Sequence, residues 1–258
     1  MKTALITGAS EGIGLELTRL FAQNHMNLVL VARNEIRLQE IKNEVSQQGI
    51  AVSLYARDLS KIENAMEIYN DLKSKSISVD YLVNNAGFGI DDEYTEIPWQ
   101  RELEMFNLNM ITLAYFTKEF AKDMKSRGFG RILNLGSTGS FQPGPYMAGY
   151  CATKAFVLNL SEAVNYELKN SGVSVTTLCP GVTKTKFHDV AQTGQTLMSK
   201  ILAQATPKDV AKYGFKLMMK GKQSGIHGLM NKLMIFSIRF GTRKLVVAMS
   251  AKLLKSKK

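Results

Sequence analysis

The stretch TGASEGIG (residues 7–14) follows the apolar run ALI (residues 4–6) and holds three glycines and two hydroxyl residues. Ile13, Leu17 and Phe21 continue at helical spacing, so we expect a strand, a glycine-rich loop and a helix that begins near Gly12. Glycine adopts backbone conformations closed to other residues, and a helix start attracts anions. We interpret the loop as a phosphate-binding loop formed by Gly8, Ser10, Glu11, Gly12, Ile13 and Gly14. A glycine-rich turn without a ligand is the alternative, because the spacing differs from the general G-x-G-x-x-G pattern.

Strand and helix patterns alternate along the rest of the chain. Short apolar runs predict strands at residues 3–7, 27–32, 51–55, 80–87, 131–137 and 173–180. Helical patterns begin at about residue 12 and cover about 35–48, 61–75, 98–126 and 150–170, and another helix starts at Thr206-Pro207. This alternation produces a parallel sheet with helices on both faces. The predicted fold class is α/β: a Rossmann-like, doubly wound parallel sheet in a single domain with a helical C-terminal extension.

Composition narrows the class of protein. The 258 residues are 45% apolar, which is enough for a sizeable core. A strand is expected from the start of the chain and no apolar run reaches 18 residues, so we expect neither a signal peptide nor a membrane span. Cys151 and Cys179 are too few for a disulfide framework and are expected to be buried. We therefore predict a cytoplasmic protein, and we expect no metal site because no His or Cys group has ligand spacing.

Chemically distinctive residues follow the ends of the predicted strands. The glycine loop follows the first strand, Arg33 the second, Asp58 the third and NNAG (residues 84–87) the fourth. Ser137 follows the fifth strand, and PGVTKT (residues 180–185) follows the sixth. Ligands of a doubly wound sheet bind beyond the carboxyl ends of its strands. The sequence therefore predicts one site built from all six strand ends, although Asn84 and Asn85 also fit a role as braces between strands.

The end of the second strand bears on the choice of dinucleotide. An acidic residue there would bind the ribose 2′-hydroxyl of NAD, but the chain has Ala32 and Arg33. A guanidinium pairs well with a 2′-phosphate, so NADP(H) is favoured over NAD(H). The alternative is that Arg33 simply begins an exposed helix, and Glu11 does not help a phosphate at this end.

The stretch GYCATK (residues 149–154) places Tyr150 and Lys154 four residues apart on one helical face. A nearby ammonium lowers the pKa of a phenol, whose ordinary value is about 10, and so produces a proton donor or acceptor near neutral pH. Ser137 is placed to hold a substrate oxygen against the Tyr150 hydroxyl. A Tyr–Lys pair alone is more often a surface contact, so its meaning depends on the other motifs.

Taken together, TGASEGIG, NNAG, Asn109, Ser137, YCATK and PGVTKT resemble the short-chain dehydrogenase/reductase family over about residues 1–225. The resemblance implies a catalytic tetrad of Asn109, Ser137, Tyr150 and Lys154. Tyr150 would exchange the proton, Ser137 would polarise the substrate oxygen, and Lys154 would bind the nicotinamide ribose. Asn109 would hold a water molecule, and the cofactor would carry the hydride. The resemblance also implies cofactor contacts from Asp58, Leu59, Asn85, Ala86, Gly87, Pro180, Gly181, Val182 and Thr185.

The predicted substrate pocket is apolar. It is expected to form from the loop 138–149, the segment after Gly87 and a lid at about 183–206. These segments contain Phe88, Phe141, Tyr146, Met147, Phe187 and Met198. Aromatic and methionine side chains suit a hydrophobic carbonyl compound or secondary alcohol. About half of these side chains could instead pack the lid.

Residues 226–258 are interpreted as a basic, amphipathic C-terminal extension. Residues 200–258 hold 14 Lys and Arg but one acid, Asp209, whereas residues 1–199 hold 19 bases and 21 acids. Leu229, Leu233, Phe236 and Phe240 follow helical spacing among the cations. The extension could pack on the substrate region or on a partner subunit, meet an anionic membrane surface, or bind an acidic protein. Nucleic acid is the least favoured partner.

The sequence thus predicts an NADP(H)-dependent oxidoreductase that transfers a hydride between nicotinamide and a carbonyl or secondary alcohol. One alternative substrate is a thioester-linked 3-oxoacyl chain. The alternative from another class is a non-catalytic NADP(H)-binding sensor or adaptor at a membrane surface. The family resemblance implies a homodimer or homotetramer.

Overall fold

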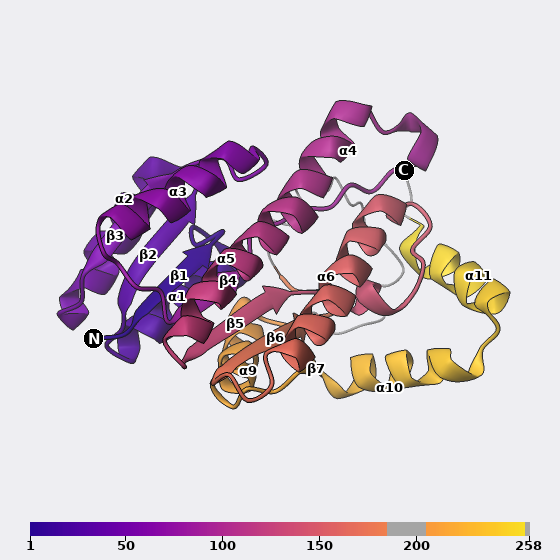
Figure 1. Cartoon of the computed structure of the whole chain (residues 1–258). Helices are drawn as coiled ribbons and strands as arrows, with labels where there is room; N and C mark the ends of the chain where they lie inside the picture. Colours follow the sequence, from indigo (N-terminus) through magenta and orange to yellow (C-terminus); the bar gives the residue numbers. More distant parts are fainter. Residues whose placement is uncertain (185–204, 256–258) are drawn as a thin grey trace.

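A computed structural model describes residues 1–184 and 205–255 (Figure 1). Seven parallel strands form one sheet in the order β3-β2-β1-β4-β5-β6-β7. The strands are β1 (Thr3–Thr7), β2 (Asn27–Ala32), β3 (Val52–Ala56), β4 (Tyr81–Asn84), β5 (Gly130–Leu135), β6 (Val173–Cys179) and β7 (Ser224–Ile226). The predicted Rossmann-like α/β fold is confirmed. The strand order reverses beside β1, which pairs with both β2 and β4.

Helices cover both faces of this sheet (Figure 1). One apolar core joins the sheet to α1 (Gly12–Gln23), α2 (Glu35–Val45) and α9 (Pro207–Met219). The other core joins it to α3 (Ile62–Ser74) and α5 (Leu113–Ser126), and α6 (Ala148–Glu167) packs beside β6. Successive residues of β1 face opposite cores, Ile6 one and Leu5 the other. A strand buried on both faces is apolar throughout, which explains the unbroken apolar runs of the sequence.

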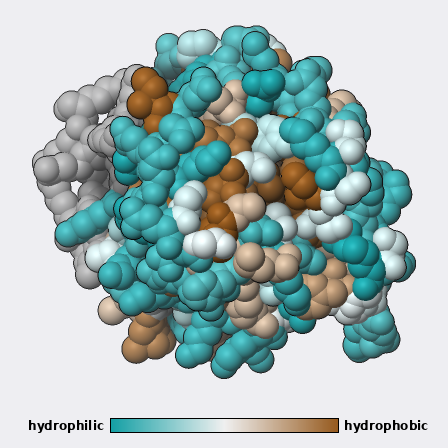
Figure 2. All heavy atoms as spheres, turned by 90° about the vertical axis from the view of Figure 1, so that its left-hand side faces the viewer, coloured by the Kyte–Doolittle hydropathy of each residue, from teal (hydrophilic) through white to brown (hydrophobic). Residues whose placement is uncertain are grey.

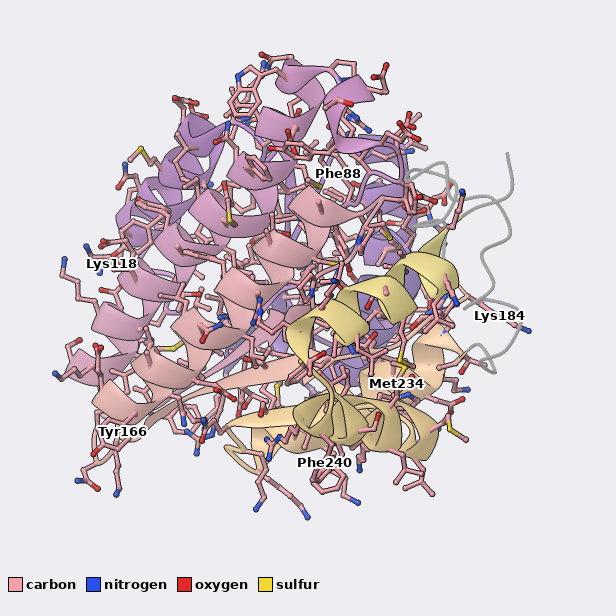
Figure 3. All side chains as sticks on the ribbon, turned by 90° about the vertical axis from the view of Figure 1, so that its right-hand side faces the viewer. Phe88, Lys118, Tyr166, Lys184, Met234 and Phe240 are labelled. Carbon is pink, nitrogen blue, oxygen red and sulfur yellow. The ribbon has the colours of Figure 1, made fainter. Side chains whose placement is uncertain are left out.

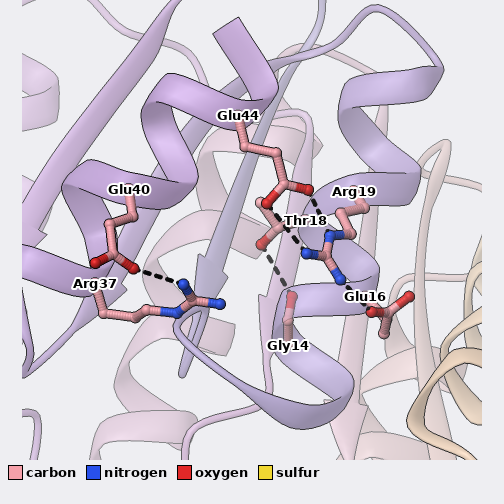
Figure 4. A network of polar contacts seen from close by, with 7 residues as sticks. All are labelled: Gly14, Glu16, Thr18, Arg19, Arg37, Glu40 and Glu44. Atoms are coloured by element: carbon pink, nitrogen blue, oxygen red, sulfur yellow. Dashed lines mark hydrogen bonds and ion pairs between the residues drawn. The ribbon is translucent and has the colours of Figure 1, made fainter.

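Helix α1 is held to α2 by a network on the outside of the fold (Figure 4). Arg19 Nε and Nη2 donate to the two carboxylate oxygens of Glu44 at 2.7 and 3.1 Å, and Nη1 donates to Glu16 at 2.6 Å. The guanidinium holds the pKa of Glu44 below its ordinary value. Within α1, Thr18 Oγ1 donates to the carbonyl oxygen of Gly14 at 2.9 Å. These exposed ion pairs add little stability, but they fix α2 against the helix that carries the glycine loop.

Two features differ from the expected elements. The segment expected as one helix at about 98–126 consists of α4 (Trp99–Phe106), a π-helical segment Asn107–Thr112 and α5. A π-helical segment is a local change of hydrogen bonding inside a helical run, and the sequence pattern predicted the run without this change. The seventh strand, β7, was also missed because three residues are too short for a periodic signal.

The chain beyond the sheet forms α10 (Leu229–Ser237), a short 3₁₀ segment Ile238–Phe240, and α11 (Arg243–Leu254). These helices lie at the end of the molecule opposite β3, α2 and α3 (Figure 1). They follow β7, the last strand, which ends at Ile226.

A buried polar network joins β4, β5 and α6. Asn84 Nδ2 donates to Asn134 Oδ1 at 2.8 Å, and Asn134 Nδ2 donates to Ser161 Oγ at 2.9 Å. Asn134 and Ser161 are fully buried, and Asn84 nearly so. The network therefore fixes the strand that ends in NNAG against the strand that ends in Ser137.

Asn134→Ala is expected to lower the free energy of unfolding by about 2–3 kcal/mol, because the substitution leaves buried polar partners without a hydrogen bond. Denaturant unfolding of the purified protein measures the change. The matched control is Asn159→Ala, since Asn159 is exposed on α6 and its Nδ2 donates to the carbonyl oxygen of Ala155 one turn away. Equal losses in the two variants would contradict the role given to the network.

Candidate active site

A cavity of about 350 Å³ runs along the carboxyl ends of the strands. It brings together most of the residues that the sequence singled out. Its walls include Gly8, Ser10, Glu11, Gly12, Ile13, Arg33, Asp58, Leu59, Asn85, Ala86, Gly87, Phe88, Ser137, Met147, Tyr150, Lys154, Pro180, Gly181 and Val182. Five strand ends and the glycine loop therefore meet at one site, as expected for ligand binding at the edge of a doubly wound sheet.

The glycine loop bends sharply between β1 and α1. Gly8 and Gly12 have φ values of +64° and +57°, in the left-handed region. A Cβ atom on Gly8 would lie 2.7 Å from Asn85 Nδ2 and 3.0 Å from Ala86 Cα. Glu11 stands at the N-cap of α1 in an extended conformation, and its side chain makes no capping hydrogen bond. Bare backbone and the positive end of α1 thus face the cavity, a combination that fits a pyrophosphate group.

Gly14 lies behind the loop and does not line the cavity. A Cβ atom on it would collide with the carbonyl oxygen of Gly8 and with the Asn85 side chain. The absence of a side chain at Gly14 therefore allows α1 to lie close to the end of β1. Asn85 braces the same turn, because its Nδ2 donates to the carbonyl oxygens of Thr7 and Gly8 at 3.0 and 3.1 Å.

One end of the cavity carries two guanidinium groups. Arg33 follows β2 and Arg57 follows β3, and both are exposed residues of the cavity wall. The preceding residues, Ala32 and Ala56, are paired across the two strands, so the arginines occupy equivalent positions. Arg57 Nε also lies 3.7 Å from Glu67 Oε2. The sequence analysis missed Arg57, although its position directly after an apolar strand was a usable signal.

Asp58 shapes the turn that follows Arg57. Its Oδ1 accepts hydrogen bonds from the backbone N–H and the hydroxyl of Ser60 at 3.0 and 2.9 Å. Leu59, the next residue of the cavity wall, is held through its carbonyl oxygen by Thr112 Oγ1 at 2.7 Å. The π-helical segment that contains Thr112 therefore supports this wall of the cavity.

Asn109 also belongs to the π-helical segment and is fully buried. Its amide bonds both backbone groups of Phe88: Nδ2 donates to the carbonyl oxygen at 2.9 Å, and Oδ1 accepts from the N–H at 3.2 Å. Nδ2 also donates to Thr153 Oγ1 on α6 at 3.1 Å. Asn109 does not line the cavity formed by the described residues. In this arrangement it joins the segment after β4 to the helix that carries Tyr150.

Ser137, Tyr150 and Lys154 meet on one wall of the cavity. Ser137 follows β5, and its hydroxyl makes a hydrogen bond to Tyr150 that favours the phenolate. Lys154 Nζ lies 5.6 Å from the centre of the Tyr150 ring and donates to the carbonyl oxygen of Leu135 at 2.7 Å. The four-residue spacing on α6 thus brings the two side chains to the same site.

Burial governs the proton affinities of this group. Desolvation raises the pKa of Tyr150, and the Ser137 hydrogen bond opposes the rise. Burial lowers the pKa of Lys154 from 10.5 to about 8. The phenol therefore keeps its proton at neutral pH, while the lysine ammonium loses its proton unusually easily. Cys151, also in the cavity wall, has a pKa raised to about 11 by burial, so its thiol stays protonated.

The opposite end of the cavity only partly follows the expected substrate pocket. Phe88 and Met147 line it, whereas Phe141 and Tyr146 do not line the cavity formed by the described residues. Tyr146 has a φ of +69°, and its carbonyl oxygen accepts from the Asp92 N–H. Phe141 ends the 3₁₀ turn Thr138–Phe141, whose other residues Thr138 and Gly139 face the cavity instead.

Thr185, Phe187, Met198 and most of the expected lid lie outside the described residues. The two ends of that lid are paired, since Thr183 and Ala205 form a parallel bridge. The sequence analysis missed Arg101, Glu104, Leu108, Gln142 and Leu254, which all contribute to the wall. The Arg101 guanidinium lies 4.4 Å from the centre of the Phe88 ring and 3.2 Å from Glu104. Leu254 comes from α11, so the C-terminal extension reaches the cavity.

Comparisons with known proteins place the chain in a family. The family model described as short chain dehydrogenase matches residues 2–196. NADP-dependent 3-hydroxy acid dehydrogenase YdfG of Escherichia coli is 34% identical over 216 residues, which cover 80% of this chain and 85% of that protein. Ketoacyl reductase HetN of Nostoc sp. is 30% identical over 218 residues, with 81% and 72% covered. The chain belongs to the short-chain dehydrogenase family.

A solved structure agrees with this assignment. A short-chain dehydrogenase from Sphingobium yanoikuyae in complex with NADPH matches with a TM-score of 0.82 at 28% sequence identity. The match covers 93% of this chain and 94% of that chain. The resemblance drawn from the sequence is confirmed, and so is the conclusion that the protein is an oxidoreductase of the dehydrogenase/reductase class.

Lys154 is expected to titrate with a pKa near 8, because burial disfavours its ammonium form. Carbon NMR of protein labelled at the lysine ε-carbons measures this directly, with Lys154→Arg to assign the signal. The ammonium is present below pH 8 and is lost as the pH rises through that value. A Lys154 signal that titrates with the exposed lysines, near the ordinary value of 10.5, would contradict the desolvation seen in the structure.

Proposed function

We propose that the protein is an NADP(H)-dependent reductase that transfers a hydride between nicotinamide and the carbonyl or secondary alcohol of a hydrophobic substrate. The observation that carries the proposal is the convergence of Ser137, Tyr150 and Lys154 on one cavity wall. The proposal gives Tyr150 the role of acid and base. An intact set of these residues with Asn109 disfavours the alternative of a non-catalytic sensor or adaptor.

The cavity residues fit the parts of a dinucleotide. The glycine loop and the start of α1 would hold the pyrophosphate, and Asp58 and Leu59 would border the adenine. Ala86 and Gly87 would lie beside the ribose of that half. Lys154 would hold the nicotinamide ribose, while the segment 180–182 would hold the nicotinamide. When bound, NADP(H) supplies the hydride.

Tyr150 is suited to donate a proton to a carbonyl oxygen. Burial keeps the phenol protonated, and the Ser137 hydroxyl beside it can donate to the same substrate oxygen. After proton transfer, the Lys154 ammonium would stabilise the phenolate. A protonated phenol can serve as the acid when the reaction runs as a reduction. Asn109 would act by positioning, because its amide ties the backbone of Phe88 to Thr153 on α6, the helix that carries Tyr150 and Lys154.

The substrate end supports a hydrophobic carbonyl compound. Phe88, Met147 and Leu254 supply apolar surface there. Arg101 and Glu104 are the charged residues of this end, and their ion pair reduces the attraction of either for a charged substrate. A thioester-linked 3-oxoacyl chain is the second candidate. It is favoured by the likeness to a ketoacyl reductase. The basic residues 200–258 also favour it, because they would attract an acidic protein that carries the thioester.

The proposal extends to the oligomeric state of the protein and to its cellular compartment. Exposed apolar side chains on the helices after β4 and β5, such as Ile111 and Phe156, suit a homodimer or homotetramer. Two free, buried cysteines suit a reducing compartment, and we propose a cytoplasmic protein.

Tyr150→Phe is expected to lower the rate of NADPH-dependent ketone reduction by about a hundredfold or more, because the proton donor is lost. NADPH binding is expected to stay within about twofold, since the ring is retained. A screen of hydrophobic ketones, followed by the loss of NADPH absorbance, gives the rate. Tyr166→Phe is the control, because Tyr166 is exposed at the far end of α6. Full activity in Tyr150→Phe would refute the mechanism.

Arg33→Ser and Arg57→Ser are each expected to weaken NADPH binding by roughly ten- to a hundredfold, because each removes a charged hydrogen bond to the 2′-phosphate. NADH binding should hardly change, because NADH lacks the 2′-phosphate. Titration followed by nicotinamide fluorescence measures both affinities. Arg37→Ser is the control, since Arg37 is exposed on α2 and pairs with Glu40. If Arg57→Ser behaves like Arg37→Ser, Arg57 does not read the phosphate.

A further inference from the structure

The two C-terminal helices have one side packed on the active-site region. Ile235 and Ser250 are buried on this side. The Asn231 side chain lies directly over Gly181, where a Cβ atom would collide with it. Leu254 lines the cavity and lies next to Gly144. Met234, Ile238, Val246 and Leu253 are half-buried, so the helices are docked on the fold by one side, and their other side is exposed.

The outward side chains are unusually apolar. Among the described residues, eight of the seventeen exposed large hydrophobic side chains fall within residues 229–249, and we call this set the apolar surface of the extension: Leu229, Met230, Leu233, Phe236, Phe240, Leu245, Val247 and Met249. Phe240 is 78% exposed and Phe236 56% exposed, and their rings contact each other at 5.3 Å rather than the core. Exposed apolar area of this kind marks an interaction site.

The figures place this surface at one end of the molecule. Figure 3 shows Phe240 at the outer edge of the C-terminal helices, with nitrogen-ended side chains extending on the same side. The opposite end, which carries β3, is mostly hydrophilic, and its apolar residues lie mainly in a recess (Figure 2). The exposed apolar groups are thus concentrated where the extension lies.

Cations surround the apolar surface. Lys232, Arg239, Arg243, Lys244 and Lys252 are exposed in the same segment. The sequence holds no acid after Asp209. None of the ion pairs between described residues includes these five cations. The surface therefore presents apolar groups and uncompensated positive charge together.

We propose that the apolar surface of the extension docks the protein on an anionic lipid membrane. Amphipathic helices with aromatic and leucine side chains among lysines and arginines lie in the interface of such membranes. In the described part of the chain, no helix is long and apolar enough to cross a bilayer. Docking in the plane of the membrane would place the exposed apolar side chains of α10 and α11 in the interface and the cations of the segment at the headgroups.

Charge argues against a second copy of the chain as the occupant. A twofold contact would place this basic surface against itself, and like charges facing each other weaken a contact. The rest of the chain offers little compensation, because residues 1–199 are close to neutral, with 19 bases and 21 acids. An anionic membrane supplies both the negative charge and the apolar layer.

Vesicle co-sedimentation of the full-length protein, without substrate or cofactor, tests the proposal independently of the proposed function. The protein should sediment with vesicles of phosphatidylcholine and phosphatidylglycerol and stay in solution with phosphatidylcholine alone. Arg239→Ser/Arg243→Ser/Lys244→Ser should weaken binding on the order of a hundredfold. Phe236→Ser/Phe240→Ser should weaken it by roughly tenfold or more.

Two control variants remove the same kinds of group elsewhere. Ile36→Ser removes an exposed apolar side chain from α2, and Lys61→Ser/Lys73→Ser/Lys75→Ser removes three positive charges at α3. Both should bind anionic vesicles as the unchanged protein does, and thermal unfolding should show that every variant is folded. Failure to bind anionic vesicles, or equal binding to neutral ones, would overturn the proposal. The proposal would also be overturned if the two test variants bound anionic vesicles as tightly as the two control variants. A dimer that Phe236→Ser/Phe240→Ser converts to monomers, without vesicle binding, would show a contact between copies instead.

Discussion

The close approach of α1 to the ends of β1 and β4 is the constraint on which the site depends. Gly8 turns the chain with a positive φ, and Gly14 lets α1 come against the Gly8 carbonyl oxygen. The Asn85 amide closes the arrangement by bonding the carbonyl oxygens of Thr7 and Gly8. The helix start is thereby aimed along the sheet edge where the other strand ends lie. A side chain at either glycine would displace the loop from this position.

The chemistry depends on burial as much as on the identity of the residues. An exposed tyrosine and lysine four residues apart would keep nearly ordinary pKa values. In the structure, burial raises the pKa of Tyr150 and lowers that of Lys154 to about 8. The sequence analysis expected the ammonium to lower the pKa of the phenol, whereas desolvation is the larger effect. The result is a proton donor beside a cation, which suits the reduction of a carbonyl group.

Local patterns predicted most of the fold because the sheet is buried on both faces. Its strands appear as apolar runs, and Thr206 before Pro207 marked the start of α9 at its observed position. Because the runs also show where each strand ends, the residues that follow the strands could be assigned to one site. Two contributions to the cavity wall were not predicted, because they depend on how distant segments pack. Leu254 reaches the cavity because α11 docks on the fold. Arg57 lies beside Arg33 because β3 pairs with β2.

The central claim is that the strand ends form one NADP(H) site, and titration of the purified protein with NADPH and with NADH tests it most directly. Nicotinamide fluorescence reports the binding of both dinucleotides. The account predicts saturable binding of one dinucleotide per chain, tighter for NADPH than for NADH. Absence of binding by either would contradict the assignment of the glycine loop and of the whole cavity.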